Sequence, residues 1–163
     1  MKKDTKQNKS AGVGLIEIII ATSIIAIALS ALAGLGNFSL KIQNRLQKNT
    51  MANYLASEAI EAARAVKDES WLSLSSLATD TALHPAQSGN PVKWVFSANS
   101  ESIGNFSRQV IISNVNRDAN DDITQSGGTL DANTKKITAT IDWTEQGQSQ
   151  QISLSTYLTN WQP

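Results

Sequence analysis

The stretch that decides the fold is Gly12 to Gly36, which reads GVGLIEIIIATSIIAIALSALAGLG. From Val13 to Gly36 it holds 24 residues and a single charge, Glu17. A helix of about 20 apolar residues, rising about 1.5 Å per residue, spans the hydrocarbon core of a bilayer. The stretch therefore predicts a helix that lies in or across a membrane. Its three hydroxyl side chains can bond to their own helix backbone, and they are Thr22, Ser23 and Ser30.

Glu17 is the exception within this apolar stretch. Burying a carboxylate in an apolar environment is costly, so Glu17 requires either a partner or a position near the lipid headgroups. If the chain is cut after Gly12, Val13 acquires a free amine about one helical turn from Glu17. The amine of the same chain would serve as a partner, and so would an amine at the same depth on a neighbouring copy.

The run Gly12-Val13-Gly14-Leu15-Ile16-Glu17, between a short basic leader and an apolar helix, resembles the class III signal of type IV pilins and pseudopilins. The resemblance implies that a prepilin peptidase cuts after Gly12 and methylates Val13, and that Glu17 acts in filament assembly. Val13 departs from the phenylalanine usual in the family. Gly34 falls where many major pilins have a helix-bending proline. Together with Gly36 it is expected to loosen the helix, because glycine costs about 1 kcal/mol relative to alanine there.

The charge of the leader predicts the orientation of the chain. Residues 1–12 carry four lysines against one aspartate, a net charge of +3, and the remainder has ten basic and thirteen acidic residues, a net charge of −3. Positive residues before an apolar helix favour a cytoplasmic position, so residues after the helix are expected outside. An acidic outer domain does not favour nucleic-acid binding.

The chain of 163 residues contains no cysteine. Thiol catalysis and cysteine metal sites are therefore excluded, and the outer domain must be held by packing alone or by a bound ion. With one histidine and scattered carboxylates, the sequence contains little material for an enzyme, and we expect a non-catalytic protein. An ordinary secretory signal fits poorly, because the apolar run is too long. A plain uncleaved anchor leaves Glu17 unexplained.

The helical pattern continues beyond the apolar stretch. Apolar residues recur along residues 37–67, beginning with Phe38, Ile42 and Leu46, so this segment is expected to form the amphipathic half of one helix of about 50 residues. Within it, Tyr54 to Arg64 resembles the stretch that follows the anchor in minor pilins and small type II secretion pseudopilins. Glu61 and Arg64 are expected to form a surface ion pair, and the alanines to allow a sheet to approach closely.

Residues 68–91 are expected to be a connecting loop, and residues 92–163 a β-sheet head. His84, beside Pro85 in that loop, is interpreted as a surface residue rather than a ligand or base. Four segments in the head alternate apolar and polar residues: 92–97, 107–115, 136–143 and 151–158. The turn Glu145-Gln146-Gly147-Gln148 between the last two predicts a hairpin. The predicted fold class is therefore α+β, with the long N-terminal helix packed on a four-stranded antiparallel sheet.

The segment from Arg117 to Thr124 is the one place where possible ligand groups cluster. Asp118, Asn120 and Asp122 match the first, third and fifth oxygen ligands of a calcium loop. The expected glycine is Ile123, however, and Gly128 stands where a glutamate is required. The segment is therefore either a weak calcium site or an ordinary solvated turn. Calcium is the only cofactor that the sequence suggests.

The leading functional hypothesis is a minor pilin or pseudopilin. Its expected partners are other pilin subunits, prepilin peptidase, a membrane assembly platform and membrane lipid. It would wait in the cytoplasmic (inner) membrane as a single-pass protein with its head outside, and then enter a cell-surface or periplasmic filament. The alternative is a permanently membrane-anchored extracytoplasmic binding domain whose head recognises a partner or calcium. A role in DNA uptake gains no support from the acidic head. The sequence leaves open whether the machine is a pilus, a secretion system or a competence filament.

Overall fold

The computed structural model describes residues 14–161. Its first element, helix α1, runs without interruption over Leu15–Glu69, 55 residues. The chain divides into one unit that ends at Leu46 and a second that begins at Gln47. The prediction of one long helix is confirmed. The helix ends two residues after the expected Lys67, and the expected start at Val13 lies outside the described residues.

In the first unit, every described residue from Gly14 to Leu46 is exposed. The exposed side chains include large apolar ones throughout, for example Ile24 at 62% and Leu32 at 64%. Apolar surface of this extent is favourable only when something other than water covers it.

Over residues 47–161, the second unit contains the rest of α1, a short helix and seven strands. The short helix α2 is Trp71–Ser75. The strands are β1 Leu83–Ser88, β2 Lys93–Ala98, β3 Glu101–Ile103, β4 Phe106–Arg117, β5 Ile123–Thr124, β6 Thr129–Glu145 and β7 Gln148–Thr159.

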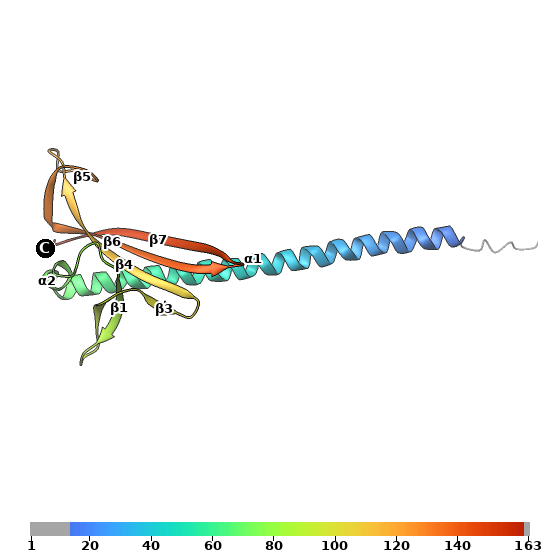
Figure 1. The fold of residues 1–163 in the computed structure, drawn as a ribbon, viewed down its shortest axis with the longest axis horizontal. Helices are drawn as coiled ribbons and strands as arrows, with labels where there is room; N and C mark the ends of the chain where they lie inside the picture. The colour runs from blue at the N-terminus through green and yellow to red at the C-terminus, as the bar shows by residue number, and fades with distance from the viewer. Residues whose placement is uncertain (1–13, 162–163) are drawn as a thin grey trace, which may run out of the picture. The chain divides into compact units, whose positions relative to one another are not determined.

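All strand pairs are antiparallel, in the order β2-β1-β4-β6-β7, with β3 and β5 each pairing with β4. Within this unit the long strands β4, β6 and β7 run beside α1, and the β1–β2 hairpin and the β5 segment leave the sheet in opposite directions (Figure 1). The β6–β7 turn consists of Gln146 and Gly147, with φ of 49° and 78°. Positive φ at both positions is typical of a tight hairpin turn, and the hairpin expected here is confirmed.

The core lies between the second half of α1 and one face of the sheet. Small residues on the helix, including Ala52, Ala56, Ala59 and Ala63, are fully buried. Facing them are buried sheet residues: Val110, Ile112, Ile137, Ala139, Ile141, Trp143 and Leu158. Because alanine has a short side chain, the sheet approaches the helix closely enough for the branched side chains to fill the layer between them.

The prediction of four strands is wrong, since the sheet has seven in the described part of the chain. The four expected segments correspond to β2, β4, β6 and β7. Strands β3 and β5 have only three and two residues, too few for alternation to be recognisable. Strand β6 begins at Thr129, ahead of the expected Lys136, and a register irregularity at Asn114/Val115 separates that polar extension from the regular pairing.

The expected connecting loop over residues 68–91 contains α2 and β1. Strand β1 tolerates Pro85 because it pairs fully with β2 but meets β4 only at Leu83↔Val110, so the proline needs no hydrogen bond on that side. His84 is thus a strand residue, and its Nδ1 lies 2.9 Å from the carbonyl oxygen of Asn99. In α2, Leu74 is fully buried whereas Leu72 is 73% exposed.

Candidate functional site

The predicted processing residues, Gly12 and Val13, lie outside the described residues. Glu17 stands in the first turn of α1, where its backbone N–H donates to the carbonyl oxygen of Gly14 at 2.8 Å. A carboxylate in a first turn interacts favourably with the positive end of the helix dipole. The Glu17 side chain is exposed, and no described cation pairs with it. The turn leaves this carboxylate accessible to a group from outside the described chain.

The surface that follows Glu17 is apolar on all sides. Thr22, Ser23 and Ser30 donate their hydroxyls to helix carbonyl oxygens one turn earlier, at 2.9, 2.7 and 2.8 Å. These bonds satisfy the hydroxyl donors within the helix, as expected. By length and composition, this helix could cross a membrane, which is weak evidence because signal sequences meet the same criterion.

Gly34 and Gly36 lie inside the continuous helix and do not end it. A Cβ atom added at either position would meet nothing within 4 Å. No neighbouring group therefore requires glycine at these positions, and the proposed flexibility stays a prediction. If it exists, its origin is the backbone freedom of glycine rather than a close contact.

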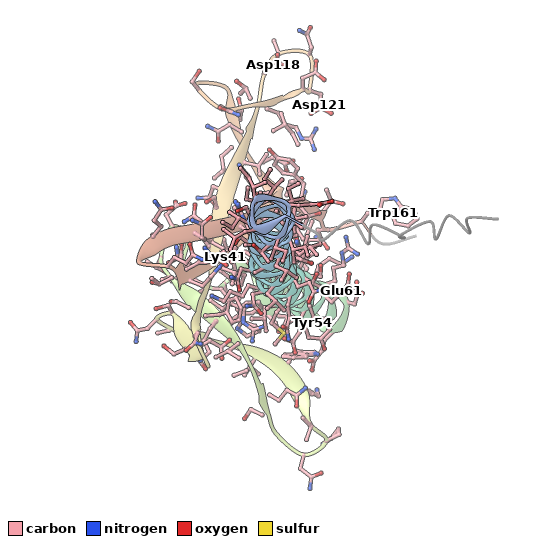
Figure 2. All side chains as sticks on the ribbon, turned by 90° about the vertical axis from the view of Figure 1, so that its right-hand side faces the viewer. Lys41, Tyr54, Glu61, Asp118, Asp121 and Trp161 are labelled. Atoms are coloured by element: carbon pink, nitrogen blue, oxygen red, sulfur yellow. The ribbon has the colours of Figure 1, made fainter. Side chains whose placement is uncertain are left out.

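The acidic loop between β4 and β5 is organised by its own first carboxylate. Asp118 Oδ1 accepts the backbone N–H groups of Asn120 and Asp122, at 2.8 and 3.0 Å. Asp118 and Asp121 lie at the outer end of the segment that joins β4 to β5 (Figure 2). Among residues 14–161, no group of three or more acidic or histidine side chains is placed to hold a metal ion. The calcium site therefore gains no support from the geometry and stays a prediction.

Arg117 supplies a positive charge to the same loop. Its Nε donates to Asp131 Oδ2 at 2.7 Å, and its Nη1 donates to the backbone oxygen of Asp121 at 2.7 Å. The hydrogen bond from Arg117, followed by one from Thr134, lowers the pKa of Asp131, and the hydrogen bond to Asp131 raises the pKa of Arg117. Gly128, at φ 75°, lies so close to the backbone of Arg117 that a Cβ would overlap it, and glycine is required there.

A second arginine joins the sheet to the second half of α1. Arg108 is only 4% exposed and lies on the buried face of β4. Its Nη1 donates to Glu58 Oε2 of the helix at 2.7 Å and to the carbonyl oxygen of Leu55 at 3.3 Å. Its Nε donates to Glu101 Oε1 of β3 at 2.7 Å. The three side chains form an ion cluster that connects three elements, with the arginine buried and both glutamates partly exposed.

Sequence reasoning missed both arginine clusters, although one signal was present. Arg108 alternates in phase with Val110 and Ile112, which are fully buried, so a charged residue stands on the core face of a strand. Lys135 is likewise in phase with Ile137 and is 9% exposed, and its Nζ donates to Asn114 Oδ1 at 2.6 Å. A charge in phase with the apolar face predicts a buried partner, but it does not identify that partner.

Comparison of the chain with protein-family models, with curated proteins and with solved structures gave no match.

Proposed function

We propose that this protein is a structural subunit, a minor pilin or pseudopilin, which is processed by a prepilin peptidase and assembled into a type IV pilus-like or type II secretion filament. One observation carries the proposal. Glu17 is the single charge in an apolar helical surface that is exposed throughout, and it follows the Gly12-Val13 junction at the spacing of the pilin signal.

The exposed surface supports two successive environments for the helix. Before assembly, lipid would cover the side chains from Leu15 to Leu35, with the basic leader on the cytoplasmic side and the head outside. In the filament, the same surface would pack on the helices of other subunits. Both environments remove the apolar area from water, so transfer between them need not expose it.

Glu17 would give this packing its register. In an apolar filament core, two opposite charges are tolerated only together. The carboxylate of Glu17 would neutralise the new amine of Val13 on an adjacent subunit, so that a subunit in the wrong register would leave both charges unpaired. The proposed role is non-catalytic, and the proposed partners are other subunits, the peptidase and the assembly platform.

The first test is the intact mass and N-terminal sequence of the protein isolated from native membranes. A chain that begins at Val13 and carries one added methyl group is the expected result. A chain that still begins at Met1 or Lys2 would contradict the proposal. It would favour a permanently anchored extracytoplasmic binding domain.

The second test removes the charge of Glu17 and retains its size. Glu17→Gln should leave insertion into the membrane unchanged and strongly reduce incorporation into filaments, measured by immunoblot of the sheared filament fraction. Glu61→Gln is the matched control, because Glu61 is an exposed acid on the same helix whose described partner is Arg64 at 2.9 Å. Equal incorporation of both variants would refute the role of Glu17.

A further inference from the structure

The head has a hollow of about 370 Å³ near the start of β6 and the end of β7. Its lining includes Arg117, Asp131, Asn133, Thr134, Asn160 and Trp161. A smaller hollow of about 110 Å³ adjoins it, shares Asn160 and Trp161, and is also lined by Trp71. The larger volume lies within the range of about 300–1,000 Å³ usual for small-molecule sites.

The charges in the larger hollow do not favour an anion. Arg117 is the one cation in its lining, and this side chain already donates to Asp131 Oδ2 and to the backbone oxygen of Asp121. The carboxylate of Asp121 adds a further negative charge 3.6 Å from the guanidinium. With the arginine neutralised, an entering phosphate or carboxylate would meet net negative charge.

The remaining polar groups both donate and accept hydrogen bonds. The backbone N–H of Asn133 donates to Asp131 Oδ1 at 2.9 Å, and the backbone N–H of Asn160 donates to the carbonyl oxygen of Asn133 at 2.8 Å. These bonds position the two asparagine side chains. The hydrogen bond between them, from Asn160 Nδ2 to Asn133 Oδ1, is long at 3.4 Å. Each amide therefore retains donor and acceptor capacity for a ligand.

Trp161 provides an aromatic surface shared by both hollows. It is 74% exposed and projects into solvent (Figure 2). Trp71 in the smaller hollow is partly buried against the core. An indole ring combines an apolar face with a polar N–H, so the exposed ring of Trp161 offers a face on which a ligand can stack.

We propose that these adjoining hollows bind a neutral oligosaccharide, with one sugar ring stacked on Trp161 and its hydroxyls bonded to the amides of Asn133 and Asn160. Sugar hydroxyls donate and accept at once, as the two amides do. The C–H face of a sugar ring is apolar, as the indole face is. The two hollows joined at Trp161 favour a chain of sugars over a single ring. This inference does not depend on filament assembly.

The test uses the full-length protein in phosphatidylcholine nanodiscs, prepared without glycoside detergents because these carry sugar headgroups. Chitotriose, cellotriose and maltotriose are the probes, measured by saturation-transfer NMR and titration at concentrations up to about 10 mM. Binding of at least one trisaccharide is expected. Its affinity should fall about tenfold or more in Trp161→Ala, and less in Trp161→Phe, which retains a ring.

Tyr157→Ala is the matched control, because Tyr157 is an aromatic residue of β7, 44% exposed, that lines neither hollow. The affinity of Tyr157→Ala for the trisaccharide should equal that of the wild type. Thermal unfolding verifies that each variant is folded. The inference is overturned if no trisaccharide binds, or if Trp161→Ala binds as tightly as the wild type. It is also overturned if only trilysine binds and depends on Trp161, since the hollow would then be a site for basic peptides.

Discussion

Both parts of helix α1 carry apolar residues, but only the second part buries a face within the protein. From Leu15 to Leu46 every side chain is exposed, whereas from Gln47 to Glu69 one face is buried against the sheet. The first part presents large branched residues, and the second presents mainly alanines to its partner. Hydrophobicity alone therefore does not decide which residues form the core of this chain. The size of the side chains decides whether a sheet can approach.

The largest expected effect separates the sheet core from the exposed helix surface. Ile137→Ala should lower the free energy of unfolding by about 3 kcal/mol, because Ile137 is fully buried and its truncation leaves a cavity. Ile24→Ala, on the exposed first part of α1, should change it by less than about 0.5 kcal/mol. Urea unfolding in nanodiscs, followed by tryptophan fluorescence, measures both. Equal losses would contradict the comparison.

A matched pair of alanine substitutions tests the role of side-chain size within one helix. Ala59→Leu should destabilise the head by about 2 kcal/mol, since Ala59 is fully buried under the sheet and the larger residue has no room. Ala33→Leu makes the same chemical change on the exposed part and should leave the unfolding curve nearly unchanged. If Ala59→Leu is tolerated, the close approach of helix and sheet is not what selects alanine.

The buried arginine should matter more than the exposed one. Arg108→Ala leaves Glu58 and Glu101 without their cation, and because both carboxylates are partly exposed we expect a loss of about 1.5 kcal/mol. Arg64→Ala breaks only the exposed pair with Glu61 and should cost less than about 0.5 kcal/mol. Thermal unfolding at low and high salt measures both losses. A larger loss for Arg64→Ala than for Arg108→Ala would contradict the greater importance of the buried arginine.

The smallest expected effect is a pH dependence in the loop beyond β4. Because Arg117 lowers the pKa of folded Asp131 below its ordinary 3.8, this carboxylate stabilises the fold above that pH. Its contribution disappears as the pH falls through the lowered pKa. Asp131→Asn should therefore reduce the acid sensitivity of unfolding between about pH 5 and pH 2, measured as the difference in melting temperature from the wild type. If the melting temperatures of both proteins fall in parallel with pH, Asp131 is not the source of the acid sensitivity.

Local pattern was sufficient for much of this fold and insufficient for its polar contacts. The long helix, the apolar face of β6 and the β6–β7 turn follow from spacings of a few residues, so the sequence predicts them. Strand β1 was missed because a proline such as Pro85 usually indicates a turn. The strand accommodates it because β1 pairs fully with β2 alone. The calcium hypothesis used the spacing of Asp118, Asn120 and Asp122, but not Arg117, whose charge serves the same loop.

By itself the sequence determined the apolar stretch, the position of Glu17 within it and the helical period that continues to the head. These features are local, because each depends on which residues stand within a few turns of one another. Only the tertiary structure decided that Arg108 meets Glu58 and Glu101, that Arg117 pairs with Asp131, and that Asn133, Asn160 and Trp161 line one hollow. Those contacts join separate helices, strands and loops, and their partners are selected by the register of the sheet and the desolvation of buried charge.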